Sequence, residues 1–234
     1  MKTRQELKAI GKARFQENRW NCVLALLLVS AVLGALSYAS GGQEVREIAS
    51  EGVNITISTR NGGLGLLSLL LSGPLTVGLN AFFVRNVRGE RENLTVTTPF
   101  TEAFRGYPRK LGGSLYAGLL VVLWSLLLVI PGIVKSFSYG MTQYILADCP
   151  NVKATDAVKL SARMMRGHKA EMLVLWLSFL GWMLLTALTC GLVGIFFAGP
   201  YRQSTFAAYY LAVRDEAIRT GAVTAEQLAG TQPA

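Results

Sequence analysis

The chain has 234 residues, of which 51% are hydrophobic and only 16% are charged, and its mean hydropathy is +0.38. Soluble domains carry about 25% charged residues, so this composition indicates a membrane protein. The formal net charge of +9 would suit nucleic acid, but the basic residues are spread beside apolar segments. Anionic lipid headgroups are therefore the expected partner, and no nucleic-acid partner is predicted.

Residues 1–19 predict an amphipathic leader helix with a basic stripe at Arg4, Lys8 and Lys12. A first membrane span follows at about Trp20–Tyr38. The alternative is a cleavable signal peptide, because Ser37–Ala39 resembles a small-x-small cleavage site. The leader is long for a signal peptide, and a similar leader-plus-span pattern recurs later, so a retained span is favoured.

The polar segment Ser40–Gly63 predicts a short hairpin or an irregular loop, and the second span runs from about Leu64 to Val84. Beyond it, Thr98 is the expected N-cap of a short surface helix with Pro99 at its first position. Gly106 is expected to end that helix.

The third predicted span is Leu111–Ile130, and Pro131-Gly132 is a turn signal that ends it. The fourth span would return from Ile133 to Ala147. It is the shortest and most polar of the spans, and it contains Lys135.

A basic amphipathic helix is predicted next, capped by Thr155 or Asp156 and ended by Gly167. Helical spacing places Ala157, Leu160, Ser161, Met164 and Met165 on one face. The opposite face forms a basic stripe that Lys169 extends: Lys159, Arg163, Arg166 and Lys169. Such a helix, leading into an uncharged fifth span at Met172–Thr189, is expected to lie on a membrane surface and contact anionic lipid.

The sixth predicted span is Gly191–Val213, and Arg202 lies about eleven residues into it, or roughly 16 Å deep. An arginine at that depth is costly, so it should face the bundle or a water-filled cavity. Lys135 is the equivalent cation in the preceding pair of spans, and no Asp or Glu lies within the spans to pair with either. Arg202 and Lys135 are therefore candidate anion or lipid contacts. The alternative is a shallower hairpin from which Arg202 extends outward to the membrane surface.

Three copies of one unit are indicated, each with a surface helix and two spans. Each unit has a Gly/Pro pair near its second span: Gly73-Pro74, Pro131-Gly132 and Gly199-Pro200. Nineteen of the 23 Lys and Arg residues fall in the leader, in the segments after the second and fourth spans, or in the tail. The opposite side would hold only Arg46 and Arg60, which predicts that both termini are cytoplasmic.

Residues that could perform catalysis are few. His168 is expected to be a headgroup-level residue or a helix C-cap, and Asp148 is expected to cap a helix or pair with a basic neighbour. Glu171 likewise lies at the cytoplasmic end of a span. No nucleophile motif, phosphate loop or metal-ligand spacing is present, and Cys22, Cys149 and Cys190 show no paired spacing. Met164 and Met165 suit packing and lipid contact better than metal binding. We therefore expect no enzymatic activity, cofactor or metal.

The segments YGMTQYILADCP, DAVKLSARMMRGHK, LSFLGWMLL and GPYRQSTFAAYYLAV resemble the signature of a bacterial membrane-protein family, domain of unknown function 975. The match is close from about Phe137 to Leu211, and the leader RQELKAIGKARFQENRW is similar more loosely. Nothing specific is found between Ser40 and Gly112. The resemblance implies a helical fold in the bacterial inner membrane, and it brings no activity, substrate or catalytic residue.

These observations predict an all-α, polytopic membrane protein that forms one domain over residues 1–234. It would comprise the leader 1–19, a bundle of six transmembrane helices in three hairpins at 20–213, and a polar tail at 214–234. The expected function is that of a non-enzymatic, lipid-interacting or scaffold component of the bacterial cell envelope, with a membrane-protein partner left open. The alternative is a small transporter for an anionic or amphiphilic solute, and an integral-membrane enzyme is the weakest hypothesis.

Overall fold

The computed structural model describes residues 3–39, 62–90 and 94–230. Every regular element in those ranges is helical, which confirms the predicted all-α class. The loop predicted at 40–63 falls mainly outside the described residues, as do Arg46 and Arg60. The elements are α1 (Arg4–Glu17), α2 (Arg19–Ala39), α3 (Gly62–Arg88), α4 (Thr98–Phe104), α5 (Tyr107–Leu127), α6 (Val129–Tyr139), α7 (Thr142–Asp148), α8 (Ala154–Met164), α9 (Lys169–Leu177), α10 (Leu180–Leu188), the π-helical turn η1 (Gly194–Ala198), α11 (Gly199–Arg219) and α12 (Ala225–Ala229).

Four helical segments in the described residues are long and apolar enough to cross a membrane. They coincide to within a few residues with the predicted first, second, third and fifth spans, and they confirm that these segments are helical and of membrane length: Arg19–Ala39, Gly65–Arg88, Tyr107–Leu127 and Lys169–Leu188. The last of these combines α9 and α10. The coarse expectation of a helical protein with membrane-length apolar segments is therefore met.

The predicted fourth and sixth spans have a different character. The fourth is divided into α6 and α7 by a turn at Gly140 and Met141. In α7 the buried Gln143 accepts a hydrogen bond of 3.5 Å from the Asn80 side chain of α3, so its polar side chain is turned into the protein. The sixth begins as η1 and continues as α11, whose last turns carry several charged residues. Six spans in three hairpins stay a prediction.

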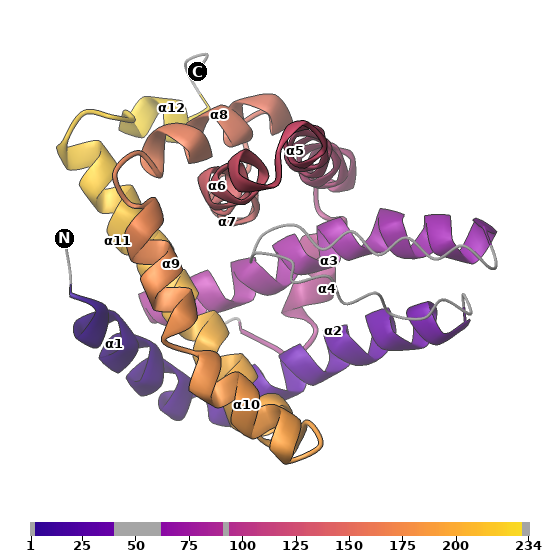
Figure 1. Ribbon diagram of the computed structural model, residues 1–234. Coiled ribbons are helices and arrows are strands. Elements are labelled where there is room, and N and C mark those ends of the chain that lie inside the picture. Colours follow the sequence, from indigo (N-terminus) through magenta and orange to yellow (C-terminus); the bar gives the residue numbers. More distant parts are fainter. Residues whose placement is uncertain (1–2, 40–61, 91–93, 231–234) are drawn as a thin grey trace.

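Helix α3 is the central helix of the molecule. In its apolar window 72% of the residues are buried, against 22%, 22% and 17% in the other three candidate spans. It contacts α2, α4, α5, α7 and α11 (Figure 1). At Gly78 the approach of α4 is so close that an added Cβ would clash with the Pro99 carbonyl oxygen and lie 2.9 Å from the Ala103 nitrogen. Only glycine allows that contact without movement of the backbone.

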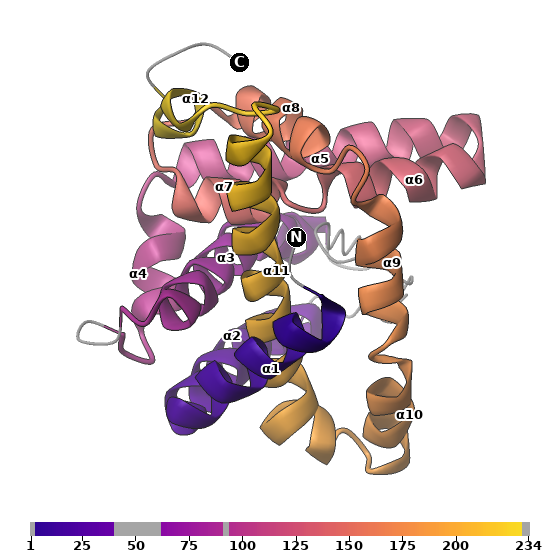
Figure 2. The same ribbon diagram turned by 90° about the vertical axis from the view of Figure 1, so that its left-hand side faces the viewer.

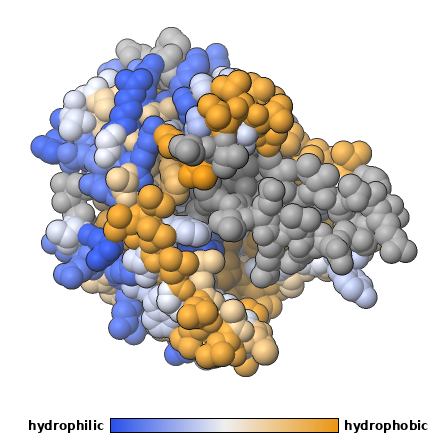
Figure 3. Space-filling model, viewed as in Figure 1, coloured by the Kyte–Doolittle hydropathy of each residue, from blue (hydrophilic) through white to orange (hydrophobic). Residues whose placement is uncertain are grey.

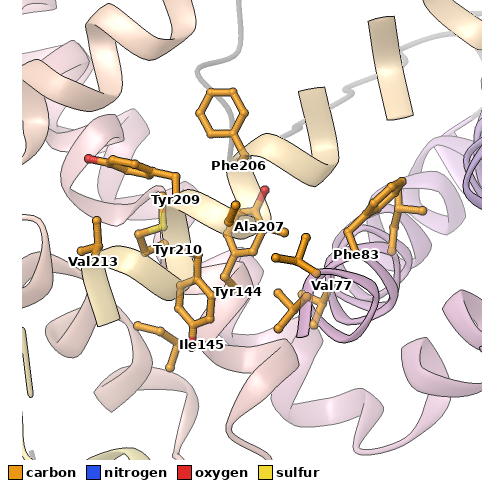
Figure 4. Close-up of a cluster of buried hydrophobic side chains, with 14 of the residues drawn as sticks. Val77, Phe83, Tyr144, Ile145, Phe206, Ala207, Tyr209, Tyr210 and Val213 are labelled. Atoms are coloured by element: carbon orange, nitrogen blue, oxygen red, sulfur yellow. The ribbon is translucent and has the colours of Figure 1, made fainter. Parts of the chain in front are cut away.

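The core beside α3 is aromatic (Figure 4). Tyr144 of α7 and Tyr210 of α11 stack with their ring centroids 5.5 Å apart, and both are buried. Phe206 and Val77 belong to the same buried cluster. This packing joins the middle and the end of the chain to its central helix.

The predicted leader helix exists as α1, and it is docked on the protein. A capping box between Thr3 and Glu6 begins it. Gly11 lies against Thr205 of α11, where an added Cβ would come within 2.5 Å of the threonine hydroxyl. Lys8 leaves the predicted basic stripe and lies 4.7 Å from the centre of the Phe179 ring. Burial, and then the charge of Arg4, lower the pKa of Lys8 below its usual range.

The order of helices follows the predicted threefold repeat. One helix (α1, α4 or α8) precedes each of three pairs of helical segments: α2 with α3, α5 with α6, and the α9–α10 segment with α11. Figures 1 and 2 show the three pairs extending in different directions from the shared core.

The outer sides of these pairs are apolar. The large hydrophobic side chains that are exposed belong mainly to α2, α5, α6, α9 and α10. Figure 3 shows hydrophobic residues over α5 and α6 and along α9 and α10, and hydrophilic residues along the left-hand edge, where α1, α11 and α12 lie. The molecule therefore has apolar surfaces, mainly on α2, α5, α6, α9 and α10, and a polar side along α1, α11 and α12.

Candidate functional site

The predicted basic amphipathic helix is α8, and its start differs from the prediction. Lys153 occupies the N-cap with an extended backbone, and its carbonyl accepts the hydrogen bond from the Ala157 amide. Thr155 and Asp156 therefore lie inside the first turn and neither caps it. The helix ends at Met164 with Met165 as its C-cap, so it stops earlier than predicted, and Gly167 lies two residues beyond the cap with a φ of +86°. A left-handed backbone is what glycine permits at this position.

The apolar face of α8 is the predicted one, but protein covers it. Leu160 and Ser161 are fully buried, and so is Met165 just after the helix. The Ser161 hydroxyl donates to the Ser138 carbonyl of α6 over 2.8 Å. The helix therefore packs on α5, α6 and α7. The expectation that this face, Met164 included, lies against lipid is wrong, because periodicity identifies a buried face without identifying what buries it.

The structure separates the four residues of the predicted basic stripe. Lys159 is exposed and lies 3.4 Å from the Asp156 carboxylate. Lys169 begins α9. Arg163 and Arg166 instead line a half-open pocket of about 310 Å³ with His168 and Met164 on one side, and Ala217, Thr220 and Ala222 at the end of α11 on the other. We call this the α8–α11 pocket.

The turn that carries His168 is fixed to α11. The Tyr209 hydroxyl donates to the His168 carbonyl over 2.9 Å. The Nδ1 atom of His168 lies 3.0 Å from the Glu171 carboxylate on the first turn of α9. His168 is the N-cap that precedes Lys169 at the start of α9, whereas the sequence predicted a C-cap residue, and its ring also reaches the α8–α11 pocket.

The two predicted intramembrane cations lie apart. The Lys135 ammonium is 4.6 Å from the centre of the Trp124 ring and 6.0 Å from that of Tyr139, so it is held against aromatic faces within the α5–α6 pair. Arg202 is half-buried in the first turn of α11. The start of α11 and α6 lie in different parts of the molecule (Figure 2). The structure therefore does not bring Arg202 and Lys135 into one site.

Asp148 is the centre of a buried ionic cluster. Its side chain is only 4% exposed, and Arg88 of α3 approaches it to 2.5 Å. Arg214 of α11 lies 3.4 Å away, and the Tyr210 hydroxyl donates to it over 2.9 Å. The predicted pairing of Asp148 with a basic residue is present, and it joins α3, α7 and α11. Arg88 and Arg214 lie far from Asp148 in the sequence, and no sequence pattern identifies them as its partners.

The turn after Asp148 is held from α5. Arg109 donates to the carbonyl oxygens of Leu146, Cys149 and Val152 over 2.6, 3.0 and 2.9 Å. Burial, and then the neighbouring Asp148 carboxylate, raise the pKa of the Cys149 thiol to about 11. A thiol with so high a pKa is a poor nucleophile and a poor metal ligand at neutral pH.

A second buried carboxylate lies in α4. Glu102 is 7% exposed, and it lies 3.0 Å from Arg85 of α3 and 3.3 Å from Arg105. The Lys110 ammonium is 3.9 Å from it and also donates to its backbone carbonyl. Within the described ranges, no three His, Cys, Asp or Glu side chains are grouped so as to hold a metal ion. Asp148 and Glu102 therefore serve as anchors between helices.

Residues 110–217 match the family described as "Protein of unknown function (DUF975)". Comparison with curated proteins and with solved structures gave no match. The matched segment includes Asp148, all of α8, and Arg163, Arg166 and His168 of the pocket. It also agrees with the resemblance drawn from the YILAD and RGHK segments. The resemblance to the domain of unknown function 975 family is therefore confirmed over residues 110–217.

Proposed function

We propose that this chain is a non-enzymatic integral membrane protein that holds its polar side on anionic phospholipid headgroups. It would act as a lipid-interacting or scaffold component of the bacterial cytoplasmic membrane. The three helix pairs would enter the bilayer from the cytoplasmic side as six spans, with both termini cytoplasmic. Arg202 and Lys135 lie on separate pairs, which favours this function over the alternative of a transporter.

The observation that carries the proposal is the exposed apolar surface of the helix pairs. Only 22%, 22% and 17% of the residues are buried in the apolar windows of α2, α5 and α9–α10. In water, exposed patches of this kind mark an interaction surface. Segments of 20 or 21 residues match the roughly 20 residues needed to cross a bilayer. Lipid tails are therefore the partner that suits these surfaces best.

The polar side supplies the second argument. The buried carboxylates Asp148 and Glu102 are neutralised by their own arginines, so the chain keeps most of its excess positive charge at its surface. Lys159 in the middle of α8 and Lys169 at the start of α9 would contact anionic headgroups beside the α9–α10 segment. Basic residues near such a surface each contribute about 1 kcal/mol.

The test compares the full-length protein in lipid nanodiscs of neutral phosphatidylcholine with nanodiscs containing phosphatidylglycerol. We expect the anionic lipid to raise the thermal midpoint, and we expect the gain to shrink near 1 M salt, where the Debye length falls to about 3 Å. The variant Lys159→Gln/Lys169→Gln should lose part of the gain. Equal midpoints in the two lipids at low salt would contradict the proposal.

A further inference from the structure

Two arginine side chains line the α8–α11 pocket, and no acidic side chain is among the described residues that line it. Neither the Arg163 nor the Arg166 guanidinium has an ionic or hydrogen-bonding partner among the residues described. Elsewhere in that part of the chain, Arg88 and Arg214 share Asp148. Two adjacent guanidinium groups that face one pocket repel each other, and an anion between them would remove that repulsion.

His168 is the third polar side chain in the pocket that could contact a ligand. Its Nδ1 atom is held by Glu171, which is 51% exposed and does not line the pocket. The Nε2 atom is then the ring nitrogen left for a ligand. Thr220 adds no donor, because its hydroxyl donates to the Glu216 carbonyl over 2.9 Å. The groups able to hold a ligand are therefore the two guanidinium groups and the imidazole.

The backbone segments that carry these groups are held in place before a ligand arrives. The buried face of α8 anchors the helix on which Arg163 lies. Gly167, with a φ of +86°, then turns the chain immediately before His168. The Tyr209 hydroxyl then ties that turn to α11. A site assembled in advance loses less conformational entropy when it binds.

We infer that the α8–α11 pocket binds a phosphomonoester, an inference that rests on the proposed function and names the lipid chemistry its basic side recognises. A phosphomonoester carries close to two negative charges at neutral pH, because its second pKa is about 6. A phosphodiester carries one. Guanidinium groups match phosphate oxygens in paired hydrogen bonds, so two of them suit the dianion. The volume of about 310 Å³ holds a phosphate and a small attached group, and it lies at the lower end of ligand pockets.

Two sources of this chemistry are distinguished by experiment. The purified full-length protein is titrated in detergent with glycerol 3-phosphate, and in nanodiscs with rising fractions of phosphatidic acid, each against the matching phosphodiester. We expect saturable binding of the monoester and weaker binding of the diester. Binding in both arms assigns the site to phosphomonoesters in general, and binding in the nanodisc arm alone assigns it to the lipid headgroup.

Three variants locate the site. Arg163→Gln/Arg166→Gln should weaken monoester binding roughly tenfold or more, because charge-assisted hydrogen bonds are lost. Ala222→Leu keeps both arginines and fills the pocket from an exposed position, and it should weaken binding too. Lys12→Gln/Lys153→Gln is the matched control, since it removes two exposed lysines that do not line the pocket. That control should bind as the wild type does.

Two results would overturn the inference. One is the absence of any preference for the monoester by the wild type. The other is equal monoester binding by the wild type and by Arg163→Gln/Arg166→Gln. The proposed function is tested independently of the pocket. If phosphatidylglycerol raises the thermal midpoint of the protein in a salt-dependent way, the proposed function holds even when the pocket inference fails. If phosphatidylglycerol has no such effect, the proposed function is rejected.

Discussion

Replacing Asp148 by Asn would remove a buried negative charge, and Arg88 and Arg214 would both lose the carboxylate with which they pair. Arg88 approaches the carboxylate to 2.5 Å and Arg214 to 3.4 Å. Removing one partner of a buried ion pair costs about 3–5 kcal/mol, because the other charge stays in place without compensation. Both arginine side chains are 28% exposed, so water screens part of that loss. We therefore expect a destabilisation near 3 kcal/mol, at the lower end of the range.

The chain offers a matched control in Asp156→Asn. Its partner Lys159 has a side chain that is 57% exposed, and pairs of that kind contribute about 0–1 kcal/mol. Thermal unfolding of the full-length protein in detergent, followed by tryptophan fluorescence, would measure both variants. For a chain of this size, a destabilisation of about 3 kcal/mol lowers the midpoint of thermal unfolding by roughly 6–12 °C. Asp156→Asn should lower the midpoint by only a small fraction of that.

A double-mutant cycle with Arg88→Gln makes the test specific. If Asp148 and Arg88 stabilise the fold through each other, the double variant should be more stable than the sum of the single effects predicts. Equal shifts for Asp148→Asn and Asp156→Asn would refute the reasoning. So would strict additivity of Asp148→Asn and Arg88→Gln.

Two further predictions test the packing and the topology. Gly78→Ala should destabilise the fold by about 1–3 kcal/mol, since the new Cβ overpacks the contact with α4, whereas Gly181→Ala in α10 has open space around it and should be near neutral in the same thermal assay. On intact cells, a membrane-impermeant maleimide should label Cys190, which is exposed at the end of the α9–α10 pair. Cys22 and Cys149 should stay unlabelled, because both are buried and Cys149 at pH 8 would be only about one-thousandth thiolate. Labelling of Cys190 only after the cells are broken would contradict the six-span arrangement.

Long uncharged runs made the spans predictable. The segment Trp20–Tyr38 has no charge, and it became α2 with almost the predicted bounds. The prediction was weaker at 133–147, where the run is short and contains Lys135. Polar residues there, such as Gln143, make contacts within the protein, and the helix divides at Gly140 and Met141. Hydropathy alone could not distinguish a single short span from two helices, of which α6 packs on α5 and α8 and α7 packs on α3.

In the candidate site too, features set by neighbouring residues were predictable, and contacts between residues far apart in the sequence were not. The periodicity of α8 identified its buried face correctly, because that pattern depends only on neighbours in the sequence. The pocket could not be predicted, since Arg163 meets Thr220 only after α9, α10 and α11 have folded back. Asp148 was expected to have a basic partner, but its partners Arg88 and Arg214 lie 60 or more residues away.

The Asp148 cluster joins three helices that lie far apart in the sequence: Arg88 ends α3, Asp148 ends α7, and Tyr210 lies in α11. During synthesis the first two emerge from the ribosome well before the third. The cluster therefore cannot be completed until Tyr210 and Arg214 have been made and α11 has packed against α3. A chain that stops before Tyr210 would leave the Asp148 carboxylate short of two partners in the protein interior. Completion of this cluster thus separates a finished molecule from a truncated one, a difference that cellular quality control can detect as stability.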